Sequence, residues 1–213
     1  MVAQALKNFF KRIFLNLFKQ KRELKLGFYG PPNAGKTSLA NRICKDFTGE
    51  ELGAVSKIPH ETRKVQFKEK VEITYKGKTL TFKIVDTPGI ATKIDYEDFL
   101  RYKLKKGEAR ERAKEATQGV VESIKWIDDM DVVVVVLDAT QNPYNQVNIT
   151  IIGNLVARKI PVLIVANKID LRRNNLKKIE AAFPEYDVVG ISAKYGKNLE
   201  EFYESIFRLA KKV

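Results

Sequence analysis

The eight residues from Gly30 to Thr37, GPPNAGKT, constrain the fold of this chain more than any other stretch. They match the spacing G-x-x-x-x-G-K-[ST], in which backbone N–H groups of a glycine-rich loop surround phosphate oxygens. In such a loop Lys36 reaches the β- and γ-phosphates and the Thr37 hydroxyl binds Mg²⁺. The apolar run LKLGFY predicts a strand over 24–29 before the loop, and a helix is expected from about Lys36 to Lys45. This strand–loop–helix order predicts a phosphate-binding site at a helix N-terminus.

The rest of the chain alternates between strand-like and helix-like runs. VQFKEKVEITY and TLTFKIVD are joined by the short link KGK and predict a hairpin. DVVVVVLDA is nearly all β-branched, which is typical of a strand buried on both faces. Two further strands are expected at 161–167 and 187–192, and helices at 145–158, 173–183 and 197–211. The alternation predicts an α/β fold with a mostly parallel six-stranded sheet, one antiparallel edge strand and helices on both faces.

Three more motifs lie where strands are expected to end, the edge at which open α/β sheets bind ligands. DTPG follows the apolar FKIV, NKID follows VLIVA, and SAK ends the strand after that. Asp86 of DTPG is placed to hold Mg²⁺ through a water molecule, and the backbone N–H of Gly89 is placed to meet a γ-phosphate. The first of these motifs therefore extends the phosphate site.

The other two motifs predict the base. The Asp170 carboxylate can accept hydrogen bonds from the N1–H and the 2-amino group of guanine, and adenine has no such pair of donors. The aliphatic stem of Lys168 can cover the base, and the backbone N–H of Ala193 can donate to the guanine O6. The motifs together favour GTP over ATP.

The ordered set GPPNAGKT, DTPG, NKID and SAK, over about residues 24–211, resembles the GTPase domain of the translation-factor-related class and, within it, the Era-like family. The resemblance implies a P-loop GTPase fold and a switch threonine in PHETRK, for which Thr62 is the candidate. It implies Mg²⁺ binding by Thr37, Thr62 and Asp86. The implied nucleotide-binding residues are Asn33, Ala34, Gly35, Lys36, Thr37, Ser38, Asp86, Gly89, Asn167, Lys168, Asp170, Ser192, Ala193 and Lys194.

Hydrolysis requires charge neutralisation and a positioned water. Directly after DTPG, where Ras-like enzymes have a glutamine, this chain has Ile90, which has no hydrogen-bonding group. Slow intrinsic turnover is therefore expected, raised by a partner or by a monovalent cation. Several related GTPases use an asparagine at the position of Asn33 to help bind K⁺, so the expected catalytic set is Lys36, Thr62 and Asn33, with Mg²⁺ and K⁺ as cofactors. The alternative is that Asn33 only shapes the turn.

The segment after DTPG is long, since Gly89 and Asp138 are 49 positions apart (138 − 89). Its charged and mostly helical pattern, with a break near Lys106–Gly107, favours an enlarged second switch that binds a partner. An inert helical insert is the alternative.

The formal net charge is +13, from 39 Lys and Arg against 26 Asp and Glu, which favours polyanionic partners. Residues 1–25 hold seven basic residues and one acidic residue, a net +6 (7 − 1). Apolar residues recur every three or four positions over 2–18, which predicts a basic amphipathic helix. Such a helix over residues 2–20 can lie on an anionic membrane surface or in a protein groove, or pack on its own domain.

These patterns divide the chain into a basic amphipathic helix, 1–22, and a GTPase domain, 23–213. Bacterial Era-like proteins carry an RNA-binding KH domain after the GTPase domain, but no GxxG-bearing module follows the last predicted helix here. A single cysteine, Cys44, fits a cytoplasmic location. No apolar run reaches the roughly 18 residues that span a bilayer, and no signal peptide is recognised.

Three functional hypotheses remain. The first is a GTP-hydrolysing switch in ribosome assembly or another RNA-linked process, with ribosomal RNA or a ribosomal subunit as partner. The second is a GTPase switch held at a membrane surface or a protein groove by its N-terminal helix, and therefore peripheral at a membrane. The third is a nucleotide-holding scaffold with negligible hydrolysis, suggested by Ile90.

Overall fold

A computed structural model describes residues 23–53, 64–91 and 105–213. The predicted N-terminal helix, the predicted switch residue Thr62 and the first part of the long segment after DTPG lie outside these ranges. None of the helices within them is long and apolar enough to cross a bilayer.

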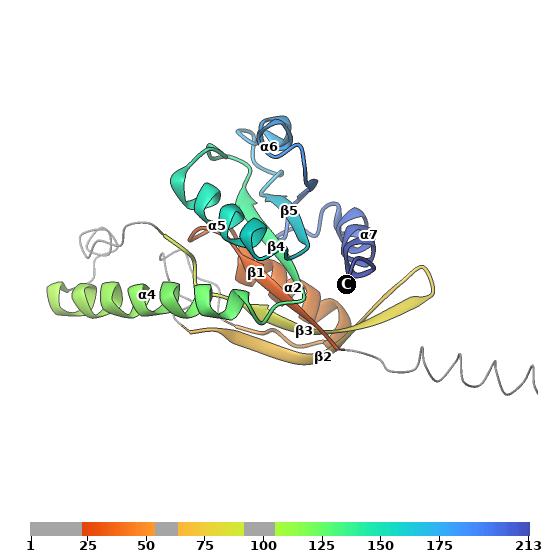
Figure 1. The fold of residues 1–213 in the computed structure, drawn as a ribbon, viewed down its shortest axis with the longest axis horizontal. Coiled ribbons are helices and arrows are strands. Elements are labelled where there is room, and N and C mark those ends of the chain that lie inside the picture. The colour runs from red at the N-terminus through yellow and green to blue at the C-terminus, as the bar shows by residue number, and fades with distance from the viewer. Residues whose placement is uncertain (1–22, 54–63, 92–104) are drawn as a thin grey trace, which may run out of the picture.

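Six strands form one mixed sheet in the order β2-β3-β1-β4-β5-β6 (Figure 1). The β2–β3 pair is antiparallel and the other described pairs are parallel, as the sequence predicts. The strands are β1 (Leu24–Tyr29), β2 (Gln66–Tyr75), β3 (Lys78–Asp86), β4 (Val132–Asp138), β5 (Val162–Asn167) and β6 (Asp187–Ile191). The helices are α2 (Lys36–Thr48), α4 (Lys106–Ile127), α5 (Gln146–Ala157), α6 (Leu176–Ala182) and α7 (Leu199–Ala210).

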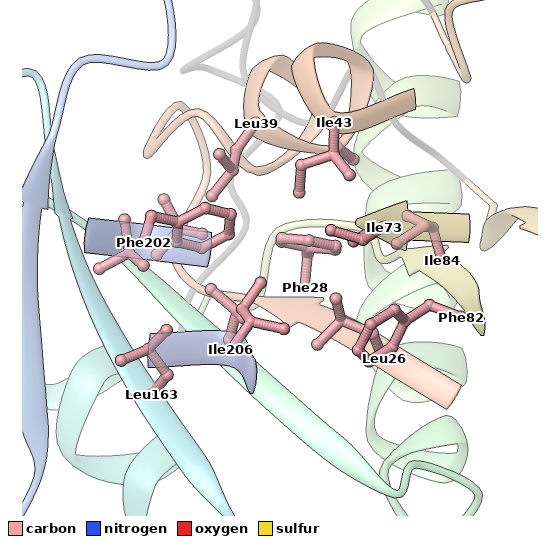
Figure 2. Packing of buried hydrophobic residues seen from close by; sticks show 14 of the residues in the cluster. Leu26, Phe28, Leu39, Ile43, Ile73, Phe82, Ile84, Leu163, Phe202 and Ile206 are labelled. Atoms are coloured by element: carbon pink, nitrogen blue, oxygen red, sulfur yellow. The ribbon is translucent and has the colours of Figure 1, made fainter. Parts of the chain in front are cut away.

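The central strand β4 carries a hydrophobic core on each face of the sheet. Val132, Val134 and Val136 belong to one cluster with residues of α2 and α7. The alternate positions face a second cluster, which includes residues of α4, α5 and α6. Figure 2 shows the first cluster, in which Leu39 and Ile43 of α2 point toward Phe28 of β1. Burial on both sides explains why this strand is a continuous apolar run rather than an alternating one.

The link between β2 and β3 is a tight turn, and the hairpin projects from the body of the molecule (Figure 1). Lys76 and Gly77 both have positive φ, 46° and 72°, as a two-residue turn between twisted strands requires. The register shifts between Lys68 and Val71, where Lys70 has a φ of 55°. The hairpin was predicted, whereas this β-bulge was not.

The helix after the phosphate-binding loop continues to Thr48, three residues beyond its predicted end at Lys45. Phe47 packs against the core, so the last turn buries apolar surface. Gly49 then ends the helix in the left-handed conformation, with φ 78° and its N–H donating to the Lys45 carbonyl. Glycine adopts this conformation without steric cost, which fixes the end of the helix there.

Candidate functional site

The loop between β1 and α2 closes around the ammonium group of Lys36. This side chain is buried, and its Nζ donates to the carbonyl oxygens of Gly30 and Pro31 at 3.2 and 3.0 Å. Gly35 has a φ of 97°, and a Cβ atom there would lie 2.2 Å from the Asn167 side chain. The loop thus holds a buried cation at the N-terminus of α2, which is the arrangement that attracts a phosphate.

Thr37 and Asp86 bring two oxygen groups together beside this lysine. Thr37 Oγ1 donates to Asp86 Oδ2 at 2.6 Å. The other oxygen, Asp86 Oδ1, is buried with no hydrogen-bond partner in the described part of the chain. Mg²⁺ prefers hard oxygen ligands and usually keeps waters and substrate phosphates in its coordination shell. A hydroxyl beside a carboxylate oxygen without a hydrogen-bond partner therefore fits Mg²⁺ that is held jointly by the protein and a phosphate. The described residues include no cluster of three or more His, Cys, Asp or Glu side chains that could hold a metal ion by themselves.

In the nucleotide-free protein, burial disfavours the charged forms of both Lys36 and Asp86. Burial raises the pKa of Asp86 to about 6, against the opposing effects of the Thr37 hydrogen bond and the Lys36 charge. Burial lowers the pKa of Lys36 to about 8, and the nearby Asp86 opposes this shift. A bound phosphate would compensate Lys36, and a bound cation would compensate Asp86.

The raised pKa of Asp86 predicts a pH-dependent stability difference for Asp86→Asn. In the native protein the Asp86 carboxyl stays protonated up to about pH 6, whereas in the unfolded chain it loses its proton near pH 3.8. The native state is therefore favoured at low pH, and this stability is lost as pH rises through that window. In nucleotide-free protein with EDTA, the unfolding free energy of Asp86→Asn should therefore rise relative to wild type between pH 4 and 6, by about 2 kcal/mol, and stay level above that. Urea unfolding at several pH values measures this difference, and a constant difference would contradict it.

The DTPG segment is fastened to the loop and to the core. Thr87 Oγ1 donates to the Phe28 carbonyl at 2.7 Å, and the Ile90 N–H donates to the Gly30 carbonyl at 3.1 Å. Gly89 lies so close to the loop that a Cβ atom would stand 2.8 Å from the Pro32 Cα. The Ile90 side chain is buried in the second core cluster. It therefore serves the core, and it presents no polar group to the site.

Helix α4 is anchored to the same segment. Ser123 is buried on α4, and its hydroxyl donates to the Pro88 carbonyl at 3.1 Å and to the Gly119 carbonyl at 2.8 Å. In the view of Figure 1 the first turns of α4 extend past the end of β3. The predicted helical part of the long segment therefore directly contacts the DTPG motif, a contact that the sequence did not indicate.

Asn167 connects the phosphate side of the site to the predicted base side. Its Nδ2 donates to the Ala34 carbonyl at 2.9 Å, and its Oδ1 accepts the Ala193 N–H at 3.0 Å. The loop, NKID and SAK motifs thus meet through one buried amide. The Ala193 N–H is predicted to donate to guanine O6, but in this structure it donates to Asn167 Oδ1. A hydrogen bond to the guanine would therefore compete with the one to Asn167.

The remaining predicted residues lie at the same edge of the sheet with different exposure. Asn33 is exposed on the loop with a φ of 59°, Ser38 and Asp170 are partly exposed, and Ser192 is buried. Lys194 is exposed with its Nζ 4.9 Å from the centre of the Tyr195 ring. Thr62 is outside the described residues. The individual roles of these residues remain predictions.

Lys168 contacts an acidic residue that sequence reasoning missed. Its Nζ lies 2.6 Å from Asp138 Oδ2 at the end of β4. Asp138 and Asn167 are partners in the β4–β5 register, so the next residue along, Lys168, is close enough to reach back. The only signal in the sequence was an acidic residue ending the run VVVVVLD.

Comparisons with known proteins identify the family of the chain. A family model described as "50S ribosome-binding GTPase" matches residues 25–168. GTPase Der from Sulfurihydrogenibium sp. is 32% identical, over 86% of this chain and 37% of its own length. The tRNA modification GTPase MnmE from Chlorobium chlorochromatii is 33% identical, over 87% of this chain and 36% of its own length. The chain thus spans little more than a third of these two relatives.

A solved structure of Era in complex with MgGDPNP and nucleotides 1506–1542 of 16S ribosomal RNA superposes with a TM-score of 0.66. The two proteins are 22% identical, and the match covers 87% of this chain and 56% of the Era chain. At this identity the likeness supports the fold alone. The family model covers 144 of 213 residues (168 − 25 + 1), so the protein belongs to the 50S ribosome-binding GTPase family.

Proposed function

We propose that this protein binds GTP with Mg²⁺ and hydrolyses it to GDP and phosphate, acting as a nucleotide-dependent switch. The observation that carries the proposal is the single site made by the phosphate-binding loop, DTPG, NKID and SAK, in which Asn167 bonds to both the loop and Ala193. Single-turnover hydrolysis of GTP is the test. Release of phosphate supports the switch, whereas tight GTP binding with no release supports a nucleotide-holding scaffold.

The proposed roles combine the contacts at Lys36, Thr37 and Asp86 with the motifs of the sequence. Lys36 and the loop amides bind and neutralise the β- and γ-phosphates, and the Gly89 N–H meets the γ-phosphate. Thr37 and Asp86 would hold Mg²⁺, which supplies further charge neutralisation when it is bound. Thr62 is proposed as a further ligand in the GTP state. On the base side Asp170 accepts from the guanine edge and the Lys168 stem covers the ring.

Water activation is the weakest part of the described site. The Ile90 side chain is buried and has no hydrogen-bonding group that could orient the attacking water, so the proposed intrinsic rate is slow. Asn33 is exposed at the loop and is proposed to help bind K⁺ near the transferred phosphate. Asn33→Gly removes this side chain and keeps the left-handed backbone, since glycine adopts positive φ readily.

Hydrolysis is accordingly expected to be at least about tenfold faster in KCl than in NaCl at equal ionic strength, a lower bound beside the roughly 10³- to 10⁵-fold that an added arginine supplies in other GTPases. Asn33→Gly should lose this difference while it retains GDP affinity. Phosphate release under single-turnover conditions measures both. Equal rates of wild type in the two salts would contradict the K⁺ proposal.

We propose a ribosome-linked role for the switch. The family description, the 16S ribosomal RNA in the Era complex and the net charge of +13 support it. Sedimentation with ribosomal subunits, in the presence of GDP and of a non-hydrolysable GTP analogue, tests it. Co-sedimentation that depends on the nucleotide supports a ribosomal switch, and its absence with both nucleotides contradicts one.

The second candidate function is a switch anchored by residues 1–22, proposed as a separate segment from the GTPase domain 23–213. The basic amphipathic pattern of residues 2–18 favours it. Sedimentation with anionic liposomes, for the full chain and for a variant lacking residues 1–22, tests it. Binding that disappears with this deletion supports an anchor, and equal binding of both proteins contradicts it.

A further inference from the structure

Both carboxylate oxygens of Asp138, at the end of β4, accept hydrogen bonds. Oδ2 accepts from Lys168 Nζ at 2.6 Å, and Oδ1 accepts from Thr140 N at 2.9 Å and from Thr140 Oγ1 at 2.7 Å. The side chains of Asp138 and Lys168 are 15% and 30% exposed, so water screens this pair only partly. Because Thr140 holds the second oxygen, the carboxylate has a fixed orientation toward Lys168.

The backbone of Lys168 is fixed as well. Lys168 has a φ of 70°, a left-handed conformation that non-glycine residues rarely adopt. The residues on either side are bonded: the Asn167 carbonyl accepts from Ala139 N at 2.9 Å, and Ile169 N donates to the Ile191 carbonyl at 3.1 Å. The lysine is therefore held both at its backbone and at its ammonium group, with the aliphatic stem stretched between them.

A free lysine side chain samples many rotamers, and ordering it against a ligand costs free energy. We propose that Asp138 is a positioning residue, which holds the Lys168 stem in place as a preformed apolar surface for the purine ring. The nucleotide then does not have to order this side chain when it binds. This inference rests on the proposed function, since it requires a guanine nucleotide in the site.

Removal of the carboxylate gives a specific pattern of effects. Asp138→Ala is expected to weaken GDP binding about tenfold, through faster dissociation, because the lysine stem regains its freedom. IDP lacks the 2-amino group but has the same ring face, so its affinity should fall by the same factor. The turnover number at saturating GTP should change by less than about twofold, because the stem contacts the base and not the phosphates. Asp138→Asn, which keeps an oxygen acceptor without the charge, should lie between wild type and Asp138→Ala.

A double-mutant cycle isolates the pair. Lys168→Ala should weaken GDP binding, and adding Asp138→Ala to it should have no further effect. Asp128→Asn removes a carboxylate that pairs with Arg158 beyond the opposite end of β4, and it should leave GDP affinity unchanged. Stopped-flow dissociation of fluorescent GDP and IDP measures all variants, with thermal unfolding as the check of folding. If Asp138→Ala does not fold, Thr140→Val, which removes one bond to Asp138 Oδ1, takes its place in the cycle.

The outcomes separate the two proposals. Failure of the wild-type protein to bind GDP would contradict the proposed function. Wild-type binding with an unchanged dissociation rate for Asp138→Ala would overturn the positioning role alone. Equal weakening by Asp138→Ala in the presence and absence of the Lys168 side chain would also overturn it, since the aspartate would then act through the fold.

Discussion

Lys36→Met is expected to abolish tight binding of GDP and GTP while the nucleotide-free protein remains at least as stable as wild type. Removing one partner of a buried charge interaction costs about 3 to 5 kcal/mol, so the nucleotide affinity should fall roughly 10²- to 10³-fold or more. The free protein gains from the change, because burial lowers the pKa of Lys36 to about 8 even though the nearby Asp86 charge opposes that shift, and the hydrogen bonds described for the ammonium go to backbone carbonyls. Function and stability therefore respond in opposite directions at this position.

Titration with fluorescent GDP and thermal unfolding in EDTA measure the two effects of Lys36→Met. The matched control is Lys45→Met on the same helix, an exposed lysine whose Nζ lies 3.6 Å from Glu51. It should change neither the GDP affinity nor the thermal stability appreciably. If the GDP affinity of Lys36→Met stayed within about tenfold of wild type, the proposed phosphate site would be contradicted.

Asp170→Asn is expected to change the base specificity from guanine to xanthine. The wild-type carboxylate can accept from both N1–H and the 2-amino group, whereas an asparagine offers one acceptor and one donor. Xanthine has a carbonyl in place of the 2-amino group, so the asparagine complements its edge. A site built to bond a polar group discriminates by about 10²-fold or more when that group is mismatched.

Competition of GDP and XDP against fluorescent nucleotide measures the change, and XDP should displace the probe better than GDP from Asp170→Asn. The control is Glu180→Gln on α6, an exposed acidic residue that should leave the preference for GDP intact. An unaltered preference for GDP in Asp170→Asn would place the base elsewhere. Loss of both nucleotides together with loss of the folded state would require Asp170→Glu as a second test.

The sheet was predictable because its signals are local. Runs such as VVVVVLD and VLIVAN are β-branched and apolar, and the KGK link supplied a glycine where the turn between β2 and β3 needs positive φ. The bulge at Lys70 was not predictable in this way, since it depends on how β2 aligns with β3. The end of α2 was placed too early because Phe47 packs against distant residues such as Tyr203, which no local pattern shows.

The same distinction between local and long-range signals applies to the candidate site. The four motifs identified the residues at the carboxyl ends of the strands, and the structure brings those within the described ranges to one edge of the sheet. The contacts that fasten them depend on register and on packing between distant elements. The hydrogen bonds from Thr87 to Phe28, from Ser123 to Pro88 and from Lys168 to Asp138 join residues that are 59, 35 and 30 positions apart. A reading of short motifs could not reveal these pairs.

The most direct test of the central claim is the affinity of nucleotide-stripped wild-type protein for GDP and ADP in the presence of Mg²⁺, measured by calorimetric titration. The site predicts one bound GDP per chain, with GDP binding about 100-fold tighter than ADP or more, because adenine offers no paired donors to Asp170. Equal affinity for the two nucleotides, or no binding of GDP, would contradict it.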